Sequence, residues 1–280
     1  QRQMCIRDRI TTESMSAAYS NLDEKLKSAL HLSYERIKSY HEKQKPKSWF
    51  DTEENGTILG QKVTPVDSAG LYIPGGKAAY PSSLLMNVIP AQVAGVQKIV
   101  ICTPTPENEP NELLLAACHL CGVSEVYKVG GASAIAAMAY GTQTIPKVDV
   151  ITGPGNIFVA TAKKMVFGDV NIDMIAGPSE IGILADDSAN ASHMAVDMLS
   201  QAEHDEMASS ILITPSQKLA DTVKIELENW LQKLPRHEIA RKSIQERGAI
   251  IVTDDMQEAI ELMNQIAPEH LEVATLSPFE

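Results

Sequence analysis

Short apolar segments alternate with longer helix-like segments over most of this 280-residue chain. The short segments have the length of buried strands, and the segments between them repeat apolar residues at helical spacing. The expected strands are 98–103, 125–129, 148–152, 170–175, 181–185, 210–214 and 249–253, and the expected helices are 82–96, 111–121, 132–140, 156–167, 188–204, 217–234 and 255–267. Such alternation is typical of parallel sheets with right-handed crossovers. The chain is therefore predicted to be an α/β protein, and the number of units favours two open sheets.

The beginning of the chain follows a different pattern. Residues 12–45 are polar and helix-prone, and 57–66 and 70–74 resemble strands. Residues Gln1 to Arg9 show neither helical nor strand periodicity. We expect these first residues not to belong to the natural domain.

Charge and composition exclude several classes of partner. The net charge is −12 and the basic residues are dispersed, so no nucleic acid is expected as a partner. No apolar run reaches membrane-spanning length, so no membrane is expected either. Cys118 and Cys121 form a C-x-x-C motif inside an apolar, helix-like run, which favours a structural role over a redox role. A reduced, cytoplasmic protein is the expectation.

Four glycine-containing turns, at 72–77, 129–133, 152–156 and 176–180, are candidates for ligand binding. Open α/β sheets bind ligands at the carboxyl ends of their strands. Three of the turns follow an expected strand and lead into a helix, whose first N–H groups can bind a phosphate. None matches G-x-G-x-x-G. One such turn is commonly a plain tight turn, whereas four on one sheet edge would indicate an anionic ligand such as a nucleotide. Both interpretations stay open.

One helix carries a polar stripe made of His193, Asp197, Gln201 and His204. Its simplest interpretation is a solvated helix face. However, Gln201 and His204 lie three residues apart, so both can point to the same side and form half of a zinc shell.

A carboxylate and an imidazole stand together at Glu269 and His270, directly after Pro268. A neutral histidine can accept a proton near pH 7, and a neighbouring glutamate can activate water. The alternative is an ordinary surface turn.

Six motifs occur in one order along the chain. They are Tyr-Ile-Pro-Gly-Gly at 72–76, Val-Gly-Gly-Ala at 129–132, Thr-Gly-Pro-Gly-Asn at 152–156, Ala-Gly-Pro-Ser-Glu at 176–180, Ser-Gln-Ala-Glu-His at 200–204 and Ala-Pro-Glu-His-Leu at 267–271. In these motifs the chain closely resembles the histidinol dehydrogenase family, from about residue 12 to its last residue. The resemblance implies an aldehyde-dehydrogenase-like architecture of two incomplete Rossmann-like parallel-sheet units, one inserted in the other. Residues 10–71 and 180–280 would form the unit with the zinc and acid/base residues, and 72–179 the inserted unit with the NAD-binding turns.

The resemblance also implies an activity and a set of site residues. The family oxidises L-histidinol through histidinal to L-histidine with two NAD+ in succession, as a zinc-containing homodimer. Gln201 and His204 would bind zinc and, with Ser179 and His270, the substrate. His270 would be the base and Glu269 would activate water. The residues implied to contact NAD are Tyr72, Ser133 and Asn156.

Two departures from the family pattern leave alternatives open. Ser133 stands where the family commonly has a glutamine that contacts the nucleotide. The chain also lacks the family's N-terminal arm and its C-terminal part, which supplies the remaining zinc ligands. A non-catalytic nucleotide-binding fragment is therefore the main alternative. An unrelated zinc hydrolase is disfavoured because no H-E-x-x-H motif is present.

Overall fold

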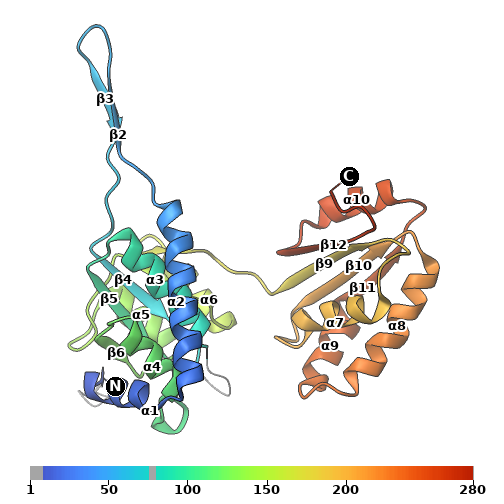
Figure 1. Ribbon diagram of the computed structural model, residues 1–280, viewed down its shortest axis with the longest axis horizontal. Helices are drawn as coiled ribbons and strands as arrows, with labels where there is room; N and C mark the ends of the chain where they lie inside the picture. The colour runs from blue at the N-terminus through green and yellow to red at the C-terminus, as the bar shows by residue number, and fades with distance from the viewer. Residues whose placement is uncertain (1–8, 76–79, 280) are drawn as a thin grey trace. The chain divides into compact units, whose positions relative to one another are not determined.

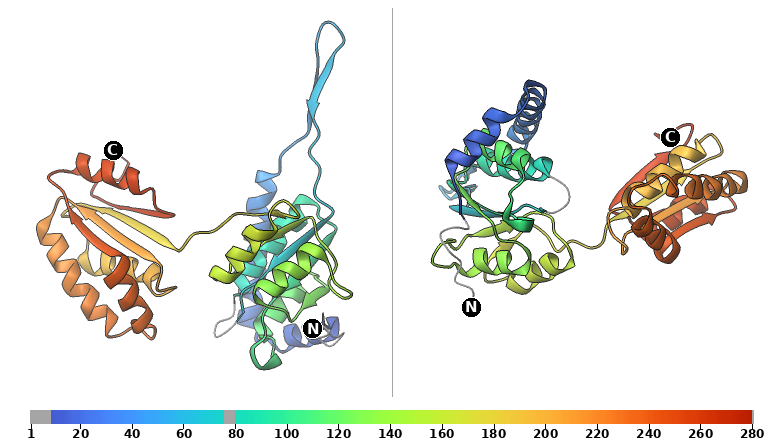
Figure 2. Two further views of the ribbon diagram at one scale, coloured as in Figure 1. Left: turned by 180° about the vertical axis from the view of Figure 1, so that it is seen from behind. Right: turned by 90° about the horizontal axis from the view of Figure 1, so that it is seen from below.

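The computed structural model describes residues 9–75 and 80–279. Residues Gln1 to Asp8 and Gly76, which entered the expectations above, lie outside these described residues. The chain divides into two compact units, Gln1–Ala176 and Gly177–Glu280 (Figures 1 and 2). None of the helices within the described residues combines the length and the apolar character that crossing a bilayer requires.

The first unit is built around a six-stranded sheet in the order β1-β6-β5-β4-β7-β8. Its strands are β1 (Arg9–Ile10), β4 (Ser68–Tyr72), β5 (Lys98–Cys102), β6 (Glu125–Tyr127), β7 (Val150–Thr152) and β8 (Asn171–Ile172). All neighbouring pairs are parallel except β1 with β6. Since β4 lies between β5 and β7 and is buried along its whole length, it is a central strand of this sheet.

Helices cover both faces of this sheet, and each face has its own apolar core. Helices α1 (Thr12–Asn21), α2 (Glu24–Gln44), α3 (Pro81–Ala94) and α4 (Glu112–Leu120) contribute to one core, and α5 (Gly131–Tyr140) and α6 (Ile157–Val166) to the other. A 3-10 turn, η2, spans Pro106–Asn108. The polar segment expected as one helix is two helices, because Asp23 interrupts it and caps α2 by accepting a hydrogen bond from the Leu26 N–H at 3.0 Å.

A two-stranded antiparallel hairpin projects from the first unit (Figure 1). It consists of β2 (Trp49–Thr52) and β3 (Ile58–Gln61), and every residue of both strands is exposed. The sequence predicts a strand at 57–66, but the structure ends that strand at Gln61, and β2 was not expected.

The second unit contains a four-stranded parallel sheet in the order β11-β10-β9-β12. The strands are β9 (Glu180–Ala185), β10 (Ser209–Thr214), β11 (Gly248–Val252) and β12 (His270–Ala274), and the helices are α7 (Ala191–Ala202), α8 (Gln217–Leu231), α9 (His237–Arg247) and α10 (Met256–Ile266). Helices α7, α8 and α9 share the core on one face, and α10 covers the other (Figures 1 and 2). The expected α/β class with two mainly parallel sheets is confirmed.

The expected division of the chain needs a correction. Residues 10–71 were assigned to the same unit as 180–280, with 72–179 inserted between them. In the structure β4 is hydrogen-bonded between β5 and β7, and α1 and α2 pack against α4 and α3. Residues 10–71 therefore belong to the first unit, and the two units follow one another along the chain.

Candidate functional site

The candidate nucleotide turns of the first unit pack against one another at the carboxyl edge of its sheet. The Tyr72 hydroxyl accepts a hydrogen bond from the Gly131 N–H at 3.2 Å, which joins the turn after β4 to the turn after β6. A methyl group on Gly130 would lie 2.5 Å from Pro104 Cβ, and one on Gly75 would overlap the Pro104 carbonyl oxygen. These backbones approach closely because they carry no side chain.

The turn after β7 joins the same cluster through Gly153. This glycine has φ +117°, and a Cβ there would lie 2.9 Å from the carbonyl carbon of Tyr72 and overlap its oxygen. Three residues later, Asn156 caps α6 by accepting hydrogen bonds from the N–H groups of Phe158 and Val159 at 3.1 and 3.2 Å. Tyr72, Ser133 and Asn156 therefore belong to neighbouring turns of one sheet edge.

This edge offers groups that can bind an anionic ligand. Helix α5 begins after Gly130 without a side-chain cap, so N–H groups of its first turn can bind a phosphate. Ser133 is exposed in that first turn. Tyr72 is only 4% exposed, but its hydroxyl accepts the Gly131 N–H and keeps its own proton to donate.

The fourth glycine turn leads into the second unit. Residues 176–180 lead into β9 of the second unit rather than into a helix. Ser179 stands immediately before β9, and its carbonyl oxygen accepts a hydrogen bond from the Ser209 N–H at the start of β10, at 2.9 Å. Ser179 therefore lies at the amino edge of the second sheet.

The other candidate residues of the second unit also reach this amino edge. His270 is the first residue of β12 and is paired in register with Ile181, near the start of β9. Helix α7 begins after the carboxyl end of β9, returns toward the amino edge and ends at Ala202. Gln201 and His204 therefore lie shortly before the start of β10. The His204 N–H donates to the Gln201 carbonyl oxygen at 3.0 Å. Ser179, Gln201, His204, Glu269 and His270 therefore all lie toward the amino edge of the second sheet.

The turn that carries Glu269 and His270 is seated against β9. Ala267 ends α10 in the left-handed conformation, with φ 47°. A Cβ on Gly182 would lie 2.7 Å from Pro268 Cγ, so the absence of a side chain there lets Pro268 lie across the strand. The His270 Nε2 and the Glu269 Oε2 are 4.0 Å apart, and the two side chains are 55% and 57% exposed. Both side chains are therefore open to solvent at this edge.

Glu272 is a further acidic residue near this edge that the sequence did not single out. Burial raises its pKa, and the charge of Asp197 and a hydrogen bond with Asp197 raise it further, while His193 opposes the shift. The middle of the polar stripe on α7 therefore faces β12 and is not only a solvated surface. The sequence feature that could have identified Glu272 is its two-residue spacing from His270, because alternate residues of a strand share a face.

The donor chemistry of the second unit fits part of a zinc shell. Gln201 is half-buried and His204 is exposed, and they offer an amide oxygen and an imidazole nitrogen. Structural and catalytic zinc sites use three or four protein ligands. Within residues 9–75 and 80–279, no group of three or more His, Cys, Asp or Glu residues is placed to hold a metal. These residues can therefore contribute to a zinc site but do not complete one.

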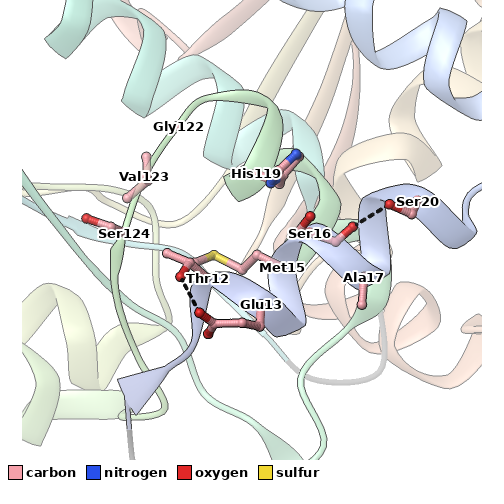
Figure 3. A pocket seen from close by; sticks show the side chains of 10 residues that line it. All are labelled: Thr12, Glu13, Met15, Ser16, Ala17, Ser20, His119, Gly122, Val123 and Ser124. Atoms are coloured by element: carbon pink, nitrogen blue, oxygen red, sulfur yellow. Dashed lines mark hydrogen bonds between the residues drawn. The ribbon is translucent and has the colours of Figure 1, made fainter.

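The cysteine pair and a cavity beside α1 lie away from the carboxyl edge of the first sheet. Cys118 and Cys121 are buried, and burial raises the pKa of Cys118 above its usual range and that of Cys121 to about 12, which supports a structural role. A cavity of about 710 Å³ between α1 and the end of α4 is lined partly by Met15 and His119 (Figure 3). It adjoins the segment that enters β6, on the opposite side of the sheet from the glycine turns.

Comparison with known proteins identifies the family. The histidinol dehydrogenase family model matches residues 3–280. The histidinol dehydrogenase of Sulfurimonas denitrificans is 89% identical over 272 residues, which cover 97% of this chain and 63% of that relative. The crystal structure of histidinol dehydrogenase from Elizabethkingia anophelis superimposes with a TM-score of 0.89 at 37% identity, covering 96% of this chain and 62% of that one.

A more distant solved structure shares the fold alone. The propionaldehyde dehydrogenase of Rhodopseudomonas palustris is 13% identical, with a TM-score of 0.51 over 96% of this chain and 84% of that protein. This agrees with the expected aldehyde-dehydrogenase-like architecture. The family match spans nearly all of the sequence, and the most similar relatives carry the same family name. The chain belongs to the histidinol dehydrogenase family.

Proposed function

We propose that the protein containing this chain oxidises L-histidinol through histidinal to L-histidine, in two successive hydride transfers to NAD+ at the end of histidine biosynthesis. The chain spans 63% of the length of its Sulfurimonas denitrificans relative. The observation that carries the proposal is that Ser179, Gln201, His204, Glu269 and His270 all lie toward the amino edge of the second sheet. A proton-transfer pair and zinc-type donors at one edge suit the oxidation of an alcohol.

The zinc-type donors would hold the substrate in place. We assign Gln201 and His204 as metal ligands, to be joined by ligands from outside this chain. Bound zinc would supply the charge that grips the amine and imidazole of histidinol. Ser179 lies at the same edge, where its hydroxyl can hydrogen-bond the substrate. Fixing the substrate against a base is the main contribution of such a site to the rate.

The acid/base pair would divide the proton transfers. In the first oxidation the His270 imidazole takes the hydroxyl proton of histidinol as the hydride leaves. Glu269 then removes a proton from the water that attacks histidinal, while His270 returns the proton it took to the carbonyl oxygen, which forms the hydrate and leaves His270 neutral again. His270 takes the hydroxyl proton of that hydrate in the second oxidation. Their exposed side chains at adjacent positions suit both tasks.

The turns of the first unit would bind the cofactor. NAD+, when bound, accepts the hydride. We assign Tyr72, Ser133 and Asn156 to its contacts because they stand on neighbouring turns at the carboxyl edge of the first sheet. The Tyr72 hydroxyl can donate a hydrogen bond, and the first turn of α5 offers N–H groups to the pyrophosphate. Assembly as a homodimer remains a prediction from the family resemblance. The cytoplasmic location and the absence of nucleic-acid and membrane partners remain predictions from the composition and charge of the sequence.

Zinc binding by His204 can be tested in a completed protein, which we define as this chain joined to the remaining residues of the Sulfurimonas denitrificans relative. His204→Asn should lower zinc content and NADH formation together, because it removes one imidazole ligand. Added zinc should restore part of the activity. Metal analysis beside an activity assay measures both. His237→Asn, an exposed histidine at the start of α9, is the matched control. Full zinc occupancy in His204→Asn would exclude the assignment.

A further inference from the structure

Lys163 of α6 is a buried lysine. Only 3% of it is exposed, and lysine is rarely buried unless its charge is paired. Its partner is Asp173, which directly follows β8 and forms an ion pair with the Lys163 ammonium. The pair connects α6 to the end of β8, and both residues adjoin the turn that follows β7.

Both side chains of this pair bond the same residue, Gly153. The Lys163 ammonium donates to the Gly153 carbonyl oxygen at 3.1 Å, and the Gly153 N–H donates to Asp173 Oδ2 at 2.9 Å. Gly153 is also the residue with φ +117° whose backbone touches that of Tyr72. The two peptide groups that flank Gly153 are therefore fixed in orientation. They determine where the chain goes next, through Pro154 and Gly155 to Asn156 at the start of α6.

We propose that Lys163 and Asp173 are positioning residues for the cofactor, and that they hold the 153–156 turn in the shape that receives NAD. This inference rests on the NAD site assigned above. Lys163 is too buried to touch a ligand, so it acts through the backbone of Gly153. Only the lysine of this pair is buried, because Asp173 is exposed. The feature that points to the turn is that both side chains hydrogen-bond the backbone of one turn residue, Gly153.

Cofactor kinetics in the completed protein test this inference. In the double variant Lys163→Met with Asp173→Asn, both charges are removed, so no unpaired ion is left buried. The KM for NAD+ should rise about tenfold or more, since a displaced turn misplaces its ligand. The KM for histidinol should stay within about twofold, because the ligand geometry of the second unit is untouched. Asp173→Asn alone is a near-isosteric change and should raise the KM for NAD+ by a smaller factor. It keeps the inference testable if the double variant does not fold.

Lys164→Met is the matched control, because Lys164 is an exposed lysine on the same helix. It should leave both KM values unchanged. A lower melting temperature in the double variant with an unchanged KM for NAD+ would show that the pair is only structural and would overturn the proposal.

Hydrogen exchange keeps this inference distinct from the proposed function. Amide exchange over residues 153–158 should be faster in the double variant than in the unaltered protein, and unchanged in Lys164→Met. Loss of the proposed function would appear as no NADH from histidinol in the unaltered completed protein. The positioning role would then be judged by exchange alone, where faster exchange at 153–158 upholds it and equal exchange rejects it.

Discussion

Glu269→Gln in the completed protein should slow the oxidation of supplied histidinal about a hundred- to ten-thousand-fold, the usual effect of removing a general base. The first hydride transfer, from histidinol, should stay near its normal rate. The reason is that only the second oxidation requires a hydrate, and we assign the activation of water to the Glu269 carboxylate. The glutamine keeps the size of the side chain but cannot accept the proton.

His270→Asn should slow both oxidations by a factor in the same range of about a hundred to ten thousand, since each hydride transfer requires loss of a proton from oxygen. Single-turnover assays that begin separately from histidinol and from histidinal measure the two steps. Glu261→Gln, an exposed carboxylate on α10, is the control and should leave both steps unchanged. Equal losses at both steps in Glu269→Gln would mean that this carboxylate acts by position or charge, and that the division of labour is wrong.

Gly153→Ala should strongly destabilise the first unit. A Cβ at this position would overlap the Tyr72 carbonyl oxygen, and φ +117° is a conformation that residues with side chains rarely adopt. Backbone strain costs about 1–3 kcal/mol and overpacking about 1–3 kcal/mol, so the expected loss in the free energy of unfolding is roughly 2–6 kcal/mol. Because Gly153 also joins the turns after β4 and β7, nucleotide affinity should fall with stability.

Gly168→Ala separates strain from steric overlap in this prediction. Gly168 has a similar φ of +106°, but nothing lies within 4 Å of the Cβ that an alanine would add. Gly168→Ala should lower the free energy of unfolding only by the strain contribution of about 1–3 kcal/mol. Denaturant unfolding of the three proteins measures the difference. Equal losses for Gly153→Ala and Gly168→Ala would show that the contact with Tyr72 does not constrain the turn.

Much of the fold could be predicted because its central strands are buried. Strands β5, β9 and β10 are short, mainly buried apolar runs between helices, and the edge strand β11 is also a short apolar run. The structure places each of the four within about one residue of its expected position. Strand β12 was missed although Leu271 and Val273 alternate with His270 and Glu272, because only two apolar residues carry the alternation in this five-residue strand. Helix α9 was missed because it buries only Ala240 and Ser243 and has no apolar stripe.

The division into units could not be derived from local pattern. The 68–72 segment has the same character as other buried strands, and only its hydrogen bonding to both β5 and β7 assigns it to the first sheet. Sheet order depends on contacts between distant segments, which periodicity does not report. The resemblance to the family named the site residues but did not supply the order of the strands.

The candidate residues of the two units differ in how far they could be predicted. The turns at 72–75, 129–133 and 152–156 lie where the rule for parallel sheets places ligands, at the carboxyl ends of strands. The same rule does not lead to the amino edge, where Ser179, His204 and His270 lie. Gln201 was chosen through the resemblance, because glutamine is a rare zinc ligand. The contact of Glu272 with Asp197 required the packing of β12 beside α7.

The yield of NADH per molecule of L-histidinol, measured in the zinc-loaded completed protein, tests the central claim most directly. Oxidation of an alcohol to an acid through an aldehyde releases two hydrides, so we predict two NADH for each histidinol consumed, with L-histidine as the product. The 280-residue chain alone serves as the comparison and should form none, because it offers only two of the zinc-type ligands. A yield of one NADH with histidinal as the end product, or no NADH from the completed protein, would contradict the account.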